Sequence, residues 1–212
     1  MERKNTTNLT PNTLQFFTPE MKHAFGRDFY ERIEPTRMPA ISIKLTNVPT
    51  GRILAGKTPF GRTNEQKRFG FQLMVDGDCV NVVLGSTDQN ILYAALLLGS
   101  LHGRSISKGV FDHREDPTFL HDVFRALAPN VSWDEWYYRA IDAHRIEDAK
   151  SKVNKALWEA LCESHPEAYY YCAVRALDKR RKDSRYAILL HNAEITCDRR
   201  FEHLLVSFSH TA

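Results

Sequence analysis

The 212-residue sequence predicts an α+β fold, with a small antiparallel sheet packed by helices and a mostly helical C-terminal half. Three observations lead to this prediction. Residues 68–84 carry a strong hairpin signal, an apolar helical segment follows them directly, and helical patterns then dominate as far as residue 182. Because strands and helices are segregated along the chain, we do not expect a doubly wound nucleotide-binding fold.

The hairpin prediction rests on Asp76-Gly77, which lies between two apolar runs. A two-residue type I′ turn needs φ > 0 at both central positions, and Asp-Gly suits this requirement. With Val75 opposite Asp78, one face of the hairpin becomes apolar and the other mixed. The apolar pairs are Leu73 with Val80, Phe71 with Val82 and Phe69 with Leu84. We therefore expect a sheet that is covered on one face only.

A buried helix is predicted over residues 88–102. Ser86, Thr87 and Asp88 offer N-cap oxygens, and the segment from Ile91 to Leu98 is apolar nearly all round. Ser132 and Glu135 form a capping box at the start of a long amphipathic pattern, with a weak point near residues 144–148. The other predicted helices cover residues 19–33, 119–127, 133–161 and 166–182.

Three further strands are predicted, at residues 41–48, 186–190 and 204–208. Residues 49–66 contain several Gly and Pro residues and mostly predict a long, basic, mobile connection, with a short strand around Ile53 inside it as an alternative. Residues 1–17 are polar and predict a flexible arm. Residues 18–212 predict a single α+β domain, with a possible sub-boundary in the irregular stretch 104–116.

Composition limits the class of protein. The net charge is only +3, from 29 basic and 26 acidic residues, so any basic surface must come from clustering. No CxxC spacing occurs, which favours reduced thiols over zinc binding or disulfides at Cys79, Cys162, Cys172 and Cys197. The N-terminus lacks an apolar leader, and the longest apolar run is much shorter than a membrane span. We expect a cytoplasmic protein without membrane association.

Lys67-Arg68-Phe69-Gly70-Phe71 is similar to the aromatic motif on the third strand of RNA-recognition domains, where a base-stacking Phe follows a basic residue, Gly and Phe. Residues 43–49 are similar to the first strand of that family. The resemblance implies base stacking by Phe69 and Phe71. That fold needs a helix and a strand between the two motifs, and only a short stretch rich in Pro and Gly lies between them here. Because both rings also fall on the apolar face of the hairpin, we favour core packing, with base stacking as the alternative.

Basic residues gather in three places. The first group lies in and beside the predicted connection and comprises Arg52, Lys57, Arg62, Lys67 and Arg68. The second comprises Lys179, Arg180, Arg181, Lys182 and Arg185, and the third is Arg199-Arg200. A cationic segment can follow a phosphate backbone, and basic residues at a helix C-terminus can instead complement the macrodipole.

Catalytic patterns are weak. His113, His121 and His144 have carboxylate neighbours, but none has the spacing of a known metal-binding motif. No nucleophile motif, P-loop or dinucleotide-binding motif occurs, so no catalytic residue, metal or cofactor is predicted. A binding protein is expected rather than an enzyme, with a hydrolase or nuclease as a less favoured alternative.

Two helical segments are rich in aromatic residues. Tyr and Trp are enriched at protein interfaces, and ordinary amphipathic packing explains the same pattern. The candidate interface residues are Trp133, Trp136, Tyr137, Tyr169 and Tyr170. They support a second functional interpretation, in which the chain is a protein-interaction or assembly subunit and forms a homo-oligomer.

Segregated basic clusters on a nearly neutral chain favour a nucleic-acid-binding function. We expect a regulator or accessory factor, with DNA preferred over RNA as its partner.

Overall fold

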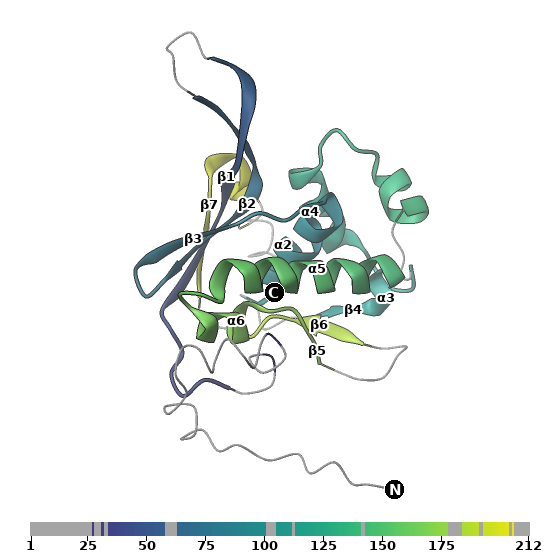
Figure 1. Cartoon of the computed structure of the whole chain (residues 1–212). Coiled ribbons are helices and arrows are strands. Elements are labelled where there is room, and N and C mark those ends of the chain that lie inside the picture. Colours follow the sequence, from purple (N-terminus) through teal and green to yellow (C-terminus); the bar gives the residue numbers. More distant parts are fainter. Residues whose placement is uncertain are drawn as a thin grey trace, which may run out of the picture.

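The structure is a computed structural model. It describes residues 27, 31, 34–57, 63–100, 105–111, 113–140, 143–177, 184–190, 193–203 and 205. Within these ranges, residues 49–57, 63–67, 139, 140, 143, 144 and 200 are described by their backbone. The fold is α+β, with a mixed four-stranded sheet, a small antiparallel three-stranded sheet, and helices concentrated in the middle and C-terminal parts of the chain (Figure 1).

The main sheet has the strand order β3-β2-β1-β7. Its strands are β1 (Ile41–Lys57), β2 (Thr63–Val75), β3 (Asp78–Val82) and β7 (Glu194–Cys197). The predicted hairpin is confirmed with its register, because Val75 lies opposite Asp78 and Leu73 opposite Val80. Both turn residues have positive φ, 49° at Asp76 and 98° at Gly77. β3 ends at Val82, two residues earlier than predicted.

Strand β7 was not predicted, and it makes the sheet mixed. It pairs in parallel with β1, with Ile43 opposite Ile195 and Leu45 opposite Cys197. The three strands that the sequence predicted for this sheet are β1, β2 and β3, and these pair antiparallel as predicted.

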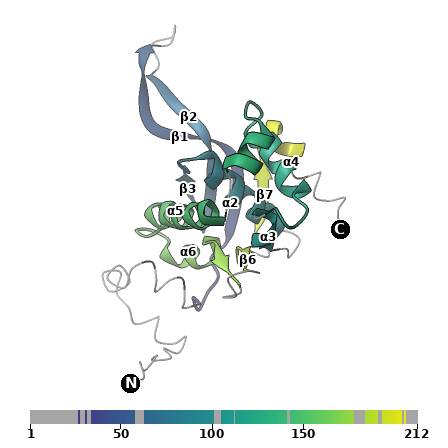
Figure 2. The ribbon, with the colours of Figure 1, turned by 90° about the vertical axis from the view of Figure 1, so that its right-hand side faces the viewer.

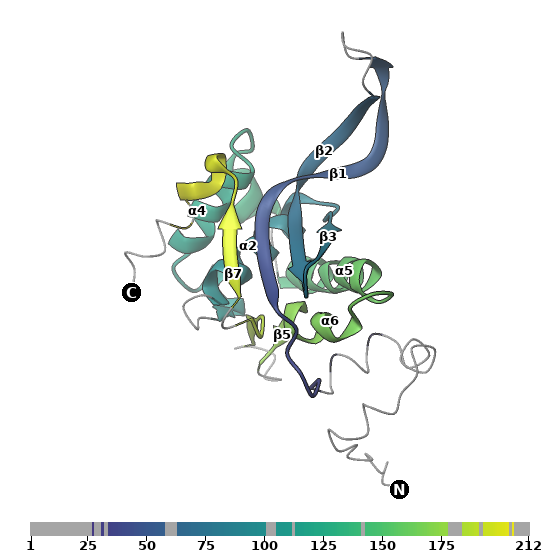
Figure 3. The same cartoon turned by 90° about the vertical axis from the view of Figure 1, so that its left-hand side faces the viewer.

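Helix α2 (Thr87–Ser100) forms the centre of the core. Every residue from Ile91 to Ser100 is buried, as predicted from the apolar run. The Phe71 ring of β2 packs edge-on against the Tyr93 ring of α2, with centroids 4.8 Å apart. Figure 3 shows the sheet on the near side of α2, with the other helices behind it. The sheet is therefore covered on one face, while Met74 and Asn81 on the opposite face are exposed.

After α2 the chain forms β4 (Ile106–Ser107), and the remaining elements follow it in chain order. They are α3 (Lys108–Phe111), α4 (Thr118–Leu127), a π-helical turn η2 (Glu135–Ala140), α5 (Ala143–Leu161), α6 (Pro166–Cys172), β5 (Arg175–Ala176), β6 (Arg185–Ala187) and a 3₁₀ turn η3 (Arg199–Phe201). The second sheet has the order β4-β6-β5.

Several predicted boundaries are wrong. Residues 49–57 and 63–66 are strand rather than connection, and residues 106–111 contain β4 and α3. The helix predicted over 133–161 is divided into η2 and α5. The helix predicted over 166–182 ends at Cys172, because the Asn154 side chain pairs with both the N–H and the C=O of Val174 and holds the backbone extended there.

Other predictions fall mostly outside the described residues. The predicted arm 1–17 lies wholly outside them, and of the predicted N-terminal helix only Arg27 and Glu31 are described, both helical. Leu205, in the strand predicted over 204–208, is helical. Among the described residues, no helix has the length and hydrophobicity needed to cross a membrane.

Candidate nucleic-acid interface

The β1–β2 ribbon extends beyond the sheet as a two-stranded arm, which we define as residues 49–57 and 63–68. Figures 1 and 2 show it leaving the body alone, without helix or strand beside it among the drawn elements. Its backbone remains paired through Pro49 with Lys67, Ile53 with Glu65 and Lys57 with Thr63. The sequence predicted a connection here, and the structure corrects most of it to a paired two-stranded ribbon.

The two strands of the arm differ in length. Lys57 lies nine residues after Val48, whereas its partner Thr63 lies five residues before Arg68, the partner of Val48. The surplus residues of β1 enter at two irregularities, one between Pro49 and Ile53 and one between Ile53 and Lys57. Surplus residues of this kind bend a ribbon and increase its twist. In Figure 3 the arm accordingly bends away from the line of the sheet.

A close contact fixes the base of the arm. Gly70 is buried, and a Cβ atom built on it would lie 2.3 Å from Val48 Cγ2 and 2.6 Å from the Val82 carbonyl oxygen. Val48 is 1% exposed. Glycine is therefore needed where β1 and β2 leave the sheet, since any side chain would push the strands apart.

Aromatic packing supports the same base. The Phe69 ring lies edge-on to Phe71 at 5.2 Å and to Phe201 of η3 at 5.0 Å, measured between centroids. Phe71 is fully buried, which confirms core packing for that ring. Phe69 is partly buried and packs against the core cluster. Neither ring lies on the open face of the sheet as a stacking platform would require.

The arm carries most of the first basic cluster. Arg52 and Lys57 lie on β1, and Lys67 and Arg68 lie on β2. Arg68 has an exposed side chain at the base of the arm. Arg62 lies outside the described residues. Residues 49–68 contain these five cations and one acid, Glu65, whereas the whole chain has 29 basic and 26 acidic residues. Positive charge is thus concentrated on this element.

Of the second basic cluster, the structure describes Arg185. Lys179, Arg180, Arg181 and Lys182 lie outside the described residues, and Arg185 is exposed on β6. Figures 1 and 2 place β6 at the opposite end of the molecule from the arm. The structure therefore does not bring Arg185 together with the arm. In the third cluster, Arg199 is exposed in η3 and the side chain of Arg200 is not described.

Arg185 lies at a small pocket of about 180 Å³. Apolar side chains of Ile106, Val110, Phe119 and Leu120 form most of its wall. Glu115 and Asp116 also line it. Two carboxylates beside the guanidinium weaken the local positive potential, so this region is a poorer phosphate site than the arm.

The candidate interface residues are largely internal. Trp136 and Tyr137 are 5% and 1% exposed, and Tyr169 is fully buried. Trp133 and Tyr170 are half-buried. The Trp133 ring stacks on Tyr137 with centroids 4.5 Å apart. Three of the five rings are therefore buried within the chain, and only Trp133 and Tyr170 of this set have partly exposed side chains. The interface role of the five residues stays a prediction.

The histidines do not converge on a site. His113 is exposed and contacts the Tyr137 ring edge-on at 4.5 Å, and His121 contacts the Trp133 ring at 4.7 Å. The side chain of His144 is not described. In the described part of the chain, no group of three or more His, Cys, Asp or Glu side chains is arranged to hold a metal ion. All four cysteines are free thiols.

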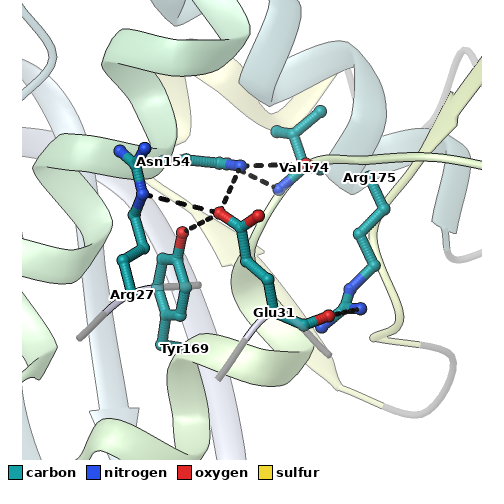
Figure 4. Close-up of polar contacts among 6 residues, drawn as sticks. All are labelled: Arg27, Glu31, Asn154, Tyr169, Val174 and Arg175. Atoms are coloured by element: carbon teal, nitrogen blue, oxygen red, sulfur yellow. Dashed lines mark hydrogen bonds and ion pairs between the residues drawn. The ribbon is translucent and has the colours of Figure 1, made fainter. Parts of the chain in front are cut away.

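A polar cluster around Glu31 joins the N-terminal residues to the body (Figure 4). The Tyr169 hydroxyl donates to Glu31 Oε1 at 2.6 Å, and Arg27 Nε lies 3.6 Å from the same oxygen. Arg175 donates to the Glu31 carbonyl and stacks over Tyr170 at 4.1 Å. Burial, followed by the hydrogen bond to Glu31, raises the pKa of Tyr169 well above its ordinary value. A neutral tyrosine held in this way is a structural donor, and the cluster holds Arg27 and Glu31 against the body of the protein.

Sequence reasoning missed the arm because Gly51, Gly56 and Pro49 suggested a loop. The available signal was a short Pro-Gly stretch with cations on both sides, Arg52 and Lys57 before it and Arg62, Lys67 and Arg68 after it, which suits a hairpin with basic strands. Comparison of the chain with protein-family models, with curated proteins and with solved structures gave no match.

Proposed function

We propose that this chain binds nucleic acid through the β1–β2 arm, acting as a non-enzymatic regulator or accessory factor that binds DNA. One observation carries the proposal: the element that projects from the body carries four cations on its two strands. A projecting basic ribbon can approach phosphates closely, whereas the same charges spread over a globular surface cannot converge on one backbone.

The proposed phosphate contacts predict how strongly affinity for DNA depends on salt. If the five cations between Arg52 and Arg68 each neutralise one phosphate, the logarithm of affinity should fall against the logarithm of salt with a slope near −4.5 on duplex DNA. Non-specific binding of this type reaches micromolar affinity at moderate salt.

The test is a salt titration by fluorescence anisotropy, using random-sequence DNA duplex, single-stranded DNA and RNA of equal length. Replacing Arg52 and Lys67 by alanine should weaken binding to every sequence and reduce the slope by about 1.8. The matched control replaces Lys152 and Lys155, which are 58% and 69% exposed on α5, and should leave the slope unchanged. Absence of micromolar binding at about 50 mM salt would reject the function.

A protein-interaction subunit is the second candidate, and the observation that favours it is Tyr138. Its side chain is 59% exposed, and its ring packs at 5.3 Å from His113 and 4.9 Å from Tyr137. An exposed, rigidly supported tyrosine is a common interface residue. Light scattering after size exclusion would test for a homo-oligomer, and Tyr138→Ala should dissociate it. A monomer at all concentrations would remove the homo-oligomer from this candidate.

A further inference from the structure

We infer that the arm lies in the major groove of B-form duplex DNA, covering at most about half a helical turn. This inference rests on the proposed function and names the form of nucleic acid that the arm binds. Three properties of the arm lead to it: its width, its length and its curvature.

The width of the arm fits one groove. It is a ribbon of two paired strands, whose backbones lie about 4.8 Å apart. The major groove of B-DNA is about 12 Å wide and admits a two-stranded ribbon, whereas the minor groove is about 6 Å wide. Insertion into the minor groove would require the duplex to be opened and kinked.

The length of the arm sets its footprint. The shorter strand runs five residues from Arg68 to Thr63, which corresponds to about 17 Å at 3.3 Å per residue. One turn of B-DNA is about 34 Å for about ten base pairs. Because the path along the groove is longer than its axial rise, the arm covers at most about five base pairs, which is half a turn.

The curvature of the arm matches a groove that winds around an axis. β1 has four more residues than β2 over the same paired stretch, so β1 takes the longer, outer path of a curve. Irregularities at two separate positions distribute this bend along the arm. A straight ribbon would leave a winding groove after a few base pairs, and a curved one can follow it.

Cations are placed on both strands, with Arg52 and Lys57 on β1 and Lys67 and Arg68 on β2. A ribbon lying along the major groove has a phosphate backbone beside each of its edges. Two cations on each strand suit that arrangement. The packed base at Gly70 and Val48 holds the arm in position before binding, which lowers the ordering cost.

Double-stranded RNA differs from DNA in the shape of its major groove. The major groove of A-form RNA is deep and narrow, so side chains cannot reach into it. An arm that binds in the major groove should therefore distinguish DNA from RNA of the same sequence and charge. A purely electrostatic contact would not, because both duplexes present similar phosphate charge.

The experiment compares four 16-base-pair probes by fluorescence anisotropy at one salt concentration. They are a DNA duplex, the RNA duplex of the same sequence, the DNA duplex with glucosylated 5-hydroxymethylcytosines that fill the major groove, and the DNA duplex saturated with the minor-groove ligand distamycin. The expected result is at least tenfold weaker binding to the RNA and to the glucosylated DNA. Distamycin should change affinity by less than threefold.

Equal affinity for glucosylated and plain DNA, equal affinity for RNA, or displacement by distamycin would each overturn the groove assignment while leaving nucleic-acid binding intact. Failure to bind any probe would instead reject the proposed function itself.

A variant tests the curvature without changing charge. Deleting Thr50 and Gly51 removes the two surplus residues between Pro49 and Ile53, and should reduce the bend of the arm. Binding to plain DNA should then weaken at least tenfold, with a thermal midpoint that matches the parent chain. Unchanged affinity in a folded variant would contradict the role of the bend. If the deletion lowers the midpoint, deleting Gly51 alone serves as the second variant, with the same expected direction.

Discussion

Strands β1 and β2 have two halves that behave differently. In the half that belongs to the sheet, residues 41–48 of β1 pair with residues 68–75 of β2 without any register shift. There, Ile43 and Leu45 are buried, with Ser42 and Lys44 half-buried between them. In the arm, the same two strands shift register twice within nine residues of β1.

The difference shows what holds register in a sheet. A shift of one residue turns every side chain to the opposite face, so a buried face such as that against α2 enforces regular pairing. The arm has no covering helix among the described elements, and backbone hydrogen bonds alone tolerate surplus residues. Burial against α2 thus preserves regular pairing in one half, and the other half, which has no covering helix among the described elements, forms a bent, basic ribbon.

The largest effect is expected from removing a buried side chain of the regular half. Leu73 is fully buried, and Leu73→Ala should lower the free energy of unfolding by about 2–5 kcal/mol. Its neighbour Met74 points to the open face and is 36% exposed, so Met74→Ala should change stability by less than about 1 kcal/mol. Urea denaturation measures both variants. Equal losses would mean that the two faces of β2 are not distinguished by burial.

A smaller effect is expected at the junction of the two halves. The Cβ atom of Gly70→Ala meets Val48 and the Val82 carbonyl, and overpacking of this kind lowers stability by about 1–3 kcal/mol. Gly85→Ala is the control, because the nearest atom there, Gln89 Oε1, would lie 3.6 Å away. Thermal unfolding of both variants provides the comparison. A Gly70→Ala variant as stable as the Gly85→Ala variant would show that the arm base can relax.

Alkaline pH should lower the free energy of unfolding, because the buried Cys172 thiol lies in the core that the regular half covers. Burial raises the pKa of the Cys172 thiol to about 12, from an ordinary value of 9.0. The unfolded chain therefore loses this proton first, and the stabilisation is complete below pH 9 and is lost as pH rises toward 12. By pH 10 the loss is about 1 kcal/mol.

Burial also raises the pKa of Tyr93, whose hydroxyl donates to the Cys172 carbonyl at 3.2 Å. The measurement is the free energy of unfolding at pH 8, 9 and 10. Cys172→Ala should flatten the dependence between pH 9 and 10. Parallel curves for the parent chain and Cys172→Ala would rule out the thiol as its source.

The smallest effect is expected at the turn at the other end of β2. Arg37 Nη2 lies 3.0 Å from Asp76 Oδ1, but the Arg37 side chain is 76% exposed. Exposed ion pairs contribute about 0–1 kcal/mol, so Arg37→Ala should be nearly neutral. Asp76→Ala should destabilise more, because Asp76 also accepts the Ala40 N–H at 3.0 Å. If thermal unfolding shows that Arg37→Ala destabilises the protein more than Asp76→Ala, the ion pair rather than the Ala40 hydrogen bond stabilises the turn.

The regular half could be predicted from sequence because its signals are local. Asp76-Gly77 fixes the turn, and the apolar alternation then determines which residues face α2. The buried helix followed for the same reason, since its apolar run is continuous in sequence. Of the candidate site, the sequence could identify the cations but not the ribbon that carries Arg52, Lys57, Lys67 and Arg68.

The rest depends on partners that are distant in sequence. A ribbon without a covering helix needs no apolar alternation in its sequence, so the Gly and Pro residues of the arm suggested a loop. α6 ends early because of Asn154, which lies twenty positions before Val174. No residue near Val174 in the sequence indicates this end. Strand β7 is four residues long and is defined by pairing with β1. Such contacts become visible only in three dimensions.

The parallel pairing of β7 also determines when the sheet can be completed. Thr46 donates to Asp198, and these residues are 152 positions apart. During synthesis from the N-terminus, the edge of β1 that pairs with β7 therefore stays unpaired until residues 194–197 have been made. Contacts that close such long loops slow folding, and an open edge strand is a site for pairing between chains. The rate and yield of refolding should consequently respond to changes in residues 194–197 more strongly than the final stability does.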